Sequence, residues 1–114
     1  MKVIIAGGRN YKFKQSDILL LKCFHYKYKF TEIVSGGATG ADAEGEAFAE
    51  NNNIMIRKYI ANWGAYKRAA GPIRNGQMAQ YADAVILFPG GDGTASMRKL
   101  SKEHGLKILY DAGE

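Results

Sequence analysis

Short, nearly continuous apolar runs alternate along this chain with longer segments in which apolar residues recur every three or four positions. Such runs are typical of strands buried on both faces, and the longer spacing is typical of amphipathic helices. The pattern predicts strands at Lys2–Ala6, Thr31–Ser35, Ile54–Tyr59, Asp83–Phe88 and Lys107–Tyr110. It predicts helices at about Gln15–Lys29, Ala41–Asn51, Ile73–Tyr81 and Thr94–His104, and a loop around Asn62-Trp63-Gly64.

This strict alternation of strand and helix predicts a parallel sheet with helices on both faces. Right-handed crossovers make it an α/β, Rossmann-like, doubly wound sheet of about five strands, and we expect the order 3-2-1-4-5. The length suits one domain, and no linker or repeat divides the chain, so we expect residues 1–114 to form a single domain.

Three of the apolar runs end in glycine-rich turns. Glycine lets backbone N–H groups approach a ligand closely, and the helix that follows adds partial positive charge, so the expected guest is a phosphate. Any one of these turns is explained equally well as tight-turn chemistry. Three turns at one edge of a parallel sheet favour a shared anion site. The turns are Gly7-Gly8-Arg9-Asn10, Gly36-Gly37-Ala38-Thr39-Gly40 and Pro89-Gly90-Gly91-Asp92-Gly93-Thr94.

Two arginines are candidate counter-charges for that anion. Arg9 follows the first strand, where its guanidinium could fork onto a phosphate. Gly71-Pro72 reads as a loop that opens a helix, which would place Arg74 in the first helical turn. A cation there opposes the helix dipole, so the position favours a functional role over that of an ordinary surface arginine.

Other residues on these loops each have a structural and a functional interpretation. Asp42 would cap a helix or accept hydrogen bonds from a ribose or an amine. Thr94 would be an N-cap, a hydroxyl for a phosphate, or both. Asp92 is a poor neighbour for a phosphate, and Trp63 would stack on a nucleobase or pack as an aromatic lid. The predicted ligand-binding set is Gly7, Gly8, Arg9, Ser35, Gly36, Gly37, Thr39, Gly40, Asp42, Trp63, Arg74, Asn75, Pro89, Gly90, Gly91, Gly93 and Thr94.

The amino-acid composition limits the classes of partner that we expect. The formal net charge of +5 favours anionic partners, without separating a nucleotide from a polynucleotide. The single cysteine, Cys23, excludes an internal disulfide and is expected to be buried; it suits a cytoplasmic location. No apolar stretch reaches membrane-spanning length, so we expect no membrane partner. His25 and His104 lack partners at metal-ligand spacing, so we assign no metal and no cofactor.

The first predicted helix is richer in apolar residues than one narrow stripe requires, since Phe24 and Tyr28 extend the run that begins at Ile18. One interpretation is a core helix with solvated lysines. The other is a subunit interface, and on that basis we expect a homodimer or a higher homo-oligomer.

The segments IIAGGRN, IVSGGATGADA, YKRAAGPIRNGQM and ADAVILFPGGDGT, together with the Asn62-Trp63 loop, resemble the SLOG superfamily, and in particular its YspA-like branch. These are Rossmann-like relatives of the Lonely Guy phosphoribohydrolases and of the DprA DNA-processing protein. The resemblance spans nearly the whole chain. It implies a Rossmann-like fold that binds a nucleotide or a nucleotide-derived ligand.

Lonely Guy enzymes pair an arginine upstream of their PGGxGT motif with a glutamate just after it. Arg74 occupies the arginine position, but Met97 stands at the glutamate position. Cleavage of an N-glycosidic bond develops oxocarbenium character that a carboxylate would stabilise, so hydrolysis by that mechanism is not expected.

We therefore expect a binding module: a sensor, carrier or sequestering protein for a nucleotide-derived small molecule. The alternative is an N-glycosidase or phosphoribohydrolase acting on nucleoside monophosphates, with Arg74 and a displaced acid, Asp42 or Asp92, as catalytic candidates. A third interpretation is DprA-like nucleic-acid binding. It requires a continuous basic stripe with exposed aromatic residues, and the lysines look dispersed along the sequence.

Overall fold

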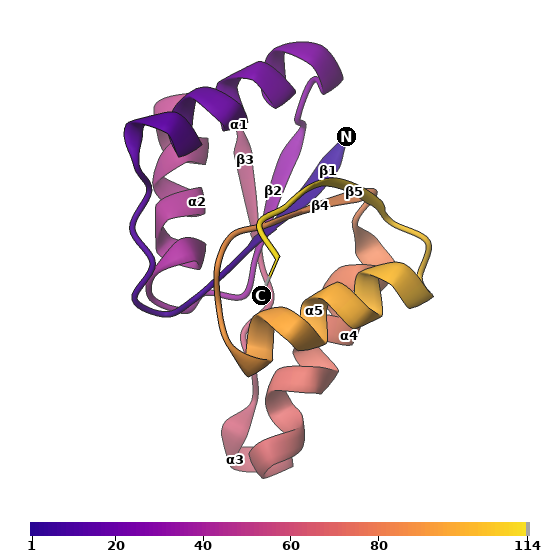
Figure 1. Cartoon of the computed structure of the whole chain (residues 1–114). Coiled ribbons are helices and arrows are strands. Elements are labelled where there is room, and N and C mark those ends of the chain that lie inside the picture. Colours follow the sequence, from indigo (N-terminus) through magenta and orange to yellow (C-terminus); the bar gives the residue numbers. More distant parts are fainter. Residues whose placement is uncertain (114) are drawn as a thin grey trace.

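The computed structural model describes residues 1–113 and contains one five-stranded sheet flanked by helices (Figure 1). All neighbouring strands are parallel, in the order β3-β2-β1-β4-β5, as predicted. The strands are β1 Lys2–Ala6, β2 Glu32–Ser35, β3 Met55–Lys58, β4 Ala84–Leu87 and β5 Lys107–Asp111. The helices are α1 Gln15–Tyr28, α2 Ala41–Asn51, α3 Trp63–Tyr66, α4 Ala70–Tyr81 and α5 Asp92–Glu103, with a 3₁₀ turn at Lys67–Ala69.

The two faces of the sheet carry separate hydrophobic clusters because successive strand residues point to opposite sides. Val3 and Ile5 belong to the cluster that includes Leu21 of α1 and Phe48 of α2. The intervening residues, such as Ile4, belong to a second cluster that includes Met78 of α4 and Met97 of α5. Figure 1 shows α1 and α2 on one side of the sheet and α4 and α5 on the other. This is the doubly wound arrangement expected from the alternating pattern.

The turns after β1, β2 and β4 are tied to one another by backbone hydrogen bonds. The Gly8 N–H donates to the carbonyl of Pro89 at 2.8 Å, and the Ala41 N–H donates to the carbonyl of Gly8 at 3.1 Å. β1 and β4 are adjacent and in register up to Ala6 and Leu87. The strand order therefore brings the three turns together at the carboxyl edge of the sheet.

Helices α1 and α2 begin at Gln15 and Ala41 as predicted, but two other helices begin earlier than predicted. Helix α4 begins at Ala70 rather than Ile73, with Pro72 inside its first turn, where a missing N–H breaks no intrahelical bond. Helix α5 begins at Asp92 rather than Thr94. The predicted loop at Asn62-Trp63-Gly64 contains the start of the short helix α3, whose Ala65 N–H donates to the Asn62 side chain at 3.1 Å.

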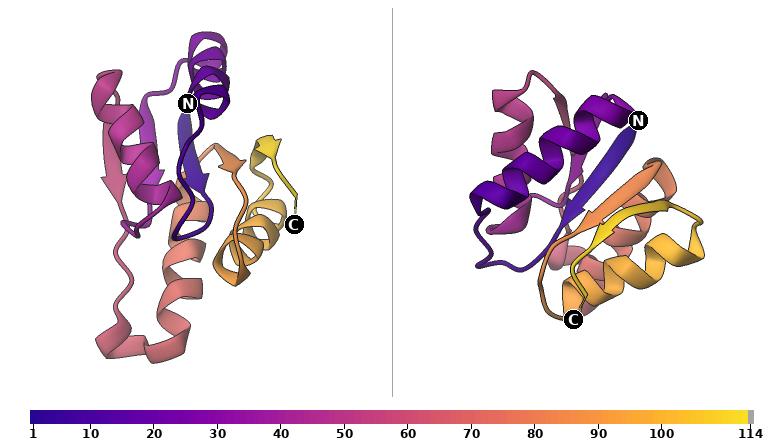
Figure 2. Two further views of the ribbon diagram at one scale, coloured as in Figure 1. Left: turned by 60° about the vertical axis from the view of Figure 1, so that its left-hand side comes forward. Right: turned by 45° about the horizontal axis from the view of Figure 1, so that its top comes forward.

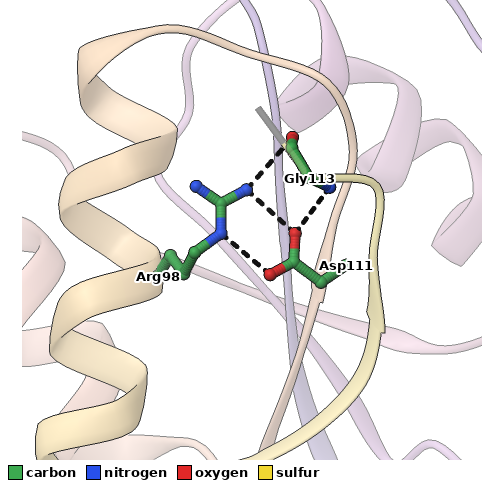
Figure 3. A network of polar contacts seen from close by, with 3 residues as sticks. All are labelled: Arg98, Asp111 and Gly113. Atoms are coloured by element: carbon green, nitrogen blue, oxygen red, sulfur yellow. Dashed lines mark hydrogen bonds and ion pairs between the residues drawn. The ribbon is translucent and has the colours of Figure 1, made fainter.

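Helix α5 is fixed against the edge strand β5 by a charged network near the C-terminus (Figure 3). The Nε and Nη2 atoms of Arg98 donate to the two carboxylate oxygens of Asp111 at 2.8 and 2.9 Å. Nη2 also donates to the carbonyl of Gly113, and the hydrogen bond from Arg98 lowers the pKa of Asp111. The bidentate pair joins the middle of α5 to the end of β5.

Part of the additional apolar surface of α1 is buried against the core of this chain. Phe24 and Tyr28 pack against the core cluster beneath α1, which leaves Tyr26 as the most exposed aromatic of that helix. Cys23 is exposed, so its predicted burial is wrong: Leu21 and Asp17 are the buried residues of α1. In the described part of the chain, no helix has both the length and the apolar character needed to cross a membrane.

Candidate functional site

A cleft of about 900 Å³ opens at the carboxyl edge of the sheet. The turns after β1, β2 and β4 line it, and α3 and α4 contribute the remaining wall. Many of the residues predicted from sequence line this one cleft: Gly7, Gly8, Arg9, Gly36, Gly37, Thr39, Asp42, Trp63, Arg74, Asn75, Gly91, Gly93 and Thr94.

Four predicted residues, Ser35, Gly40, Pro89 and Gly90, do not line the cleft but shape its walls. Ser35 is 1% exposed; its hydroxyl donates to Glu46 at 2.6 Å and accepts from the Gly37 N–H at 3.1 Å. Gly40 (φ +73°) and Gly90 allow close contacts between turns, because a Cβ at either position would collide with neighbouring atoms. The carbonyl of Pro89 accepts the hydrogen bond that joins the β1 and β4 turns.

Arg74 lies in the second turn of α4 rather than the first, because the helix begins at Ala70. Its Nη1 donates to the Gly36 carbonyl at 2.7 Å, and its Nε donates to the Asn75 side chain at 2.9 Å. Burial lowers the pKa of the Arg74 guanidinium, Asp42 opposes that effect, and Arg9 adds to it. Within residues 1–113, Arg74 forms no ion pair, and its Nη2 atom donates no hydrogen bond.

Arg9 is the second cation at the cleft. It too forms no ion pair with any residue of the described chain. Arg9 lies close enough to Arg74 for their mutual repulsion to contribute to the lowered pKa of Arg74. Asp42 and Asp92 line the same cleft, but neither carboxylate forms an ion pair with Arg9 or Arg74, so both guanidiniums could pair with a bound anion.

The N-terminus of α5 opens onto the same cleft. Its N-cap is Gly91, which supplies no capping side chain, so several first-turn N–H groups lack the usual side-chain partner. The prediction of Thr94 as the N-cap is therefore wrong: Thr94 is the third residue of the helix and is 4% exposed. Uncapped N–H groups and the helix dipole together favour an anion at this end.

Asp42 lies at the base of the β2 turn. It is the second residue of α2, whose N-cap is Gly40, and its Oδ2 accepts from the Ala38 N–H at 3.1 Å. It therefore braces the glycine turn rather than capping the helix. Burial raises the pKa of Asp42, while the Ala38 hydrogen bond and the charge of Arg74 act in the opposite direction.

Glu46, one helical turn after Asp42, was not among the predicted site residues. It accepts the hydrogen bond from Ser35, pairs with Lys58 at 3.2 Å and helps to raise the pKa of Asp42. The sequence does contain a pattern that could have indicated it: Asp42 and Glu46 are four residues apart, which places both carboxylates on one face of the predicted helix. Glu46 fixes the base of the glycine turn.

We expect the substitution Asp42→Asn to preserve or raise stability at neutral pH. The asparagine oxygen still accepts from Ala38, and the variant no longer buries a charge. Because the folded-state pKa of Asp42 is raised, the wild-type carboxyl favours folding below its unfolded pKa of about 4 and loses that contribution as pH rises. The stability advantage of the variant should therefore grow from about pH 4 towards neutrality, measured by urea unfolding. A loss of stability at every pH would show that Asp42 acts mainly as a structural brace.

Apolar side chains form the other wall of the cleft. Ile60 and Ala61 come directly after β3, Trp63 follows on α3, and Met78 comes from α4. Trp63 is 51% exposed, so much of its ring is available. Ile60 and Ala61 were missed because the segment after β3 carries no glycine pair, although it ends at the same edge of the sheet. The cleft lining therefore combines cationic and apolar side chains.

Met97, at the position of the Lonely Guy glutamate, is 2% exposed and belongs to the core cluster beneath α4 and α5. It also contributes to the cleft floor. No group of three or more metal-ligating side chains gathers anywhere in the described residues.

Residues 1–66 match the YspA, cpYpsA-related SLOG family, YAcAr. The chain belongs to this family. The match includes the β1 and β2 turns with Asp42, and it ends before Arg74 and the α5 turn. The SLOG match thus covers one side of the cleft, and the positions of Arg74 and α5 come from the structure.

The X-ray structure of DNA processing protein A (DprA) from Streptococcus pneumoniae is similar in fold, with a TM-score of 0.71 and 18% sequence identity. The similarity covers 99% of this chain and 50% of the DprA chain, so this SLOG chain spans about half of that protein. At this identity the similarity shows the fold alone. No curated protein matches the chain.

Proposed function

We propose that this SLOG-family chain binds a nucleoside monophosphate or a related nucleotide-derived ligand in the cleft. The phosphate would lie on the uncapped N-terminus of α5, between Arg9 and Arg74. The sugar would face the Gly36–Gly40 turn, and the base would lie against Trp63.

The observation that carries this proposal is the pair of unpaired guanidiniums at the cleft. Burying part of the Arg74 charge costs free energy, as its lowered pKa indicates, and Arg9 increases that cost. No carboxylate within residues 1–113 forms an ion pair with either arginine. A phosphate would supply the missing negative charge and would accept charge-assisted hydrogen bonds from Nη2 of Arg74 and from the α5 turn.

The apolar side chains that line the cleft support a base rather than a second anion. A nucleotide has a charged and an apolar part, and the cleft lining has side chains for both. Asp42 would accept hydrogen bonds from the sugar hydroxyls that join these parts, which is a reason for a glycine turn to hold a buried carboxylate.

We propose binding without rapid hydrolysis, because Met97 supplies no carboxylate beside the ligand. The alternative is N-glycosidic cleavage with Asp42 as the displaced acid, a role that its raised pKa and its place in the cleft make chemically reasonable. Calorimetry with a nucleotide panel, combined with chromatography of the products, separates the two. We expect saturable binding of a monophosphate that leaves it intact, whereas rapid release of free base would favour the enzyme.

We expect the substitution Asp92→Asn to strengthen phosphate binding. Asp92 is exposed, is the first residue of α5 and lines the cleft, so its carboxylate competes with an anion for the same N–H groups. Removing one nearby surface charge should raise affinity about two- to fivefold, and less at high salt. Weaker binding in the variant would indicate that Asp92 contacts the ligand directly. Calorimetry at two ionic strengths measures the effect.

The homodimer and the cytoplasmic location stay predictions. With Phe24 and Tyr28 packed on their own core, an α1 interface would have to use Leu19 and Tyr26, which are 55% and 83% exposed.

A further inference from the structure

Residues 51–82 form one of two basic stretches of this chain. Residues 51–82 contain no aspartate or glutamate, but they contain Arg57, Lys58, Lys67, Arg68 and Arg74. The other stretch is residues 1–29, and the acids of residues 32–50 and 83–114 offset much of its charge, which leaves a formal net charge of +5 for the whole chain.

Two of these cations are free for a partner. Arg57 pairs with Glu32 at 3.3 Å, Lys58 pairs with Glu46 at 3.2 Å, and Arg74 faces the cleft. Lys67 and Arg68 are exposed and form no ion pair with any residue from 1 to 113. The unpaired charge outside the cleft in this segment therefore lies where α3 meets α4.

Exposed aromatic rings lie in the same place. Residues 62–69, here called the arm, are exposed throughout. They include Trp63 and Tyr66, which are 51% and 52% exposed. Figures 1 and 2 show α3 projecting beyond the carboxyl ends of the strands, away from the body of the sheet. Trp63 also lines the cleft, whereas Tyr66, Lys67 and Arg68 do not, so the arm continues the cleft outward.

We propose that the arm binds single-stranded nucleic acid, whose bases stack on Trp63 and Tyr66 and whose phosphates contact Lys67 and Arg68. Exposed rings interleaved with unpaired cations are the combination that binds unpaired bases and backbone together. A duplex hides its base faces, so it would gain only the charge contacts. Helix α3 has four residues, which is far shorter than the amphipathic helices that lie in membrane surfaces.

The test compares two double variants with the same change of charge. Lys67→Glu with Arg68→Glu alters the arm, and Lys22→Glu with Lys99→Glu alters exposed lysines on α1 and α5. Binding of a labelled oligothymidine is followed by fluorescence anisotropy over a range of salt. The arm variant should bind at least about tenfold more weakly and lose roughly 1.4 from the salt slope, at about 0.7 per phosphate contact. The α1/α5 control should stay within about twofold of wild type.

Tyr66→Ser tests the stacking contribution without changing charge, and we expect roughly a fivefold or greater loss of oligothymidine affinity. Equal losses in the two charge variants, equal binding of duplex and single strand, or binding of anionic phospholipid vesicles without oligothymidine would each overturn the proposal. So would light scattering that shows the arm variant alone to be monomeric, because the arm would then be a contact between copies. The arm shares Trp63 with the cleft proposal, but Tyr66, Lys67 and Arg68 do not line the cleft, so the arm variant should keep wild-type affinity for a mononucleotide.

Discussion

Replacing Arg74 with alanine should weaken nucleotide binding by roughly 1.5–3 kcal/mol, about one to two decades in the dissociation constant, as expected for a lost charge-assisted contact. The free energy of unfolding should change by less than about 1 kcal/mol, because the lost hydrogen bonds to Gly36 and Asn75 are offset by no longer burying a charge. Calorimetry gives the affinity, and urea unfolding gives the stability.

The matched control for this variant is Arg57→Ala. Arg57 lies on β3, outside the cleft, and pairs with Glu32. Its removal takes away the same charge at a position outside the cleft, so nucleotide affinity should stay within about twofold at moderate salt. Equal losses of affinity in the two variants would show that binding follows net charge, and unchanged affinity in Arg74→Ala would remove Arg74 from the site.

The second large effect is expected from Gly40→Ala, which should lower the free energy of unfolding by roughly 2–4 kcal/mol. Gly40 has φ +73°, and a Cβ there would collide with the backbone of Gly8 and Arg9. The substitution would therefore strain the turn and push apart the β1 and β2 loops that line the cleft. Urea unfolding measures the loss.

Gly76→Ala is the control for that substitution. Gly76 lies inside α4, and a Cβ there would meet nothing within 4 Å. Alanine in a helix interior should stabilise the chain by roughly 0.5–1 kcal/mol. If Gly40→Ala were tolerated as well as Gly76→Ala, the close approach of the two turns would be contradicted.

The sheet order followed from sequence because the apolar runs of β1, β2 and β4 are short, buried and each followed by glycine. The starts of α4 and α5 did not, because Pro72 and Thr94 are typical of helix starts but lie at the third position of these helices. Gly91 caps α5 and Ala69 caps α4, so the sequence carries no capping signal at these boundaries. Each error gave a candidate site residue the wrong place in its helix: Arg74 lies in the second turn of α4 rather than the first, and Thr94 lies inside α5 rather than at its N-cap.

The glycine turns could be predicted from the sequence, because a backbone that approaches an anion closely requires glycine at the ends of strands. Arg74 could be predicted because a cation near a helix start opposes the helix dipole. Ile60, Ala61 and Met78 were not, because an apolar residue in a cleft has the same local pattern as one in the core. The arm was hidden for a different reason. Its four-residue helix is too short to give a periodic pattern of apolar residues. The sequence also does not show which cations form ion pairs; among the described residues, the structure pairs Arg57 and Lys58 with glutamates but not Lys67 and Arg68.

The central claim is that the cleft beside Arg74 is the nucleotide site, and Trp63 provides the most direct measurement. Trp63 is the only tryptophan of the chain and it lines the cleft, so a nucleotide that binds in the cleft should change the intrinsic tryptophan fluorescence. Titration with nucleoside monophosphates should change that fluorescence saturably, and Arg74→Ala should shift the midpoint about ten- to a hundredfold higher. Inorganic phosphate should compete for binding but should not quench the ring. Fluorescence that stays constant while calorimetry detects binding would place the ligand elsewhere and contradict the account.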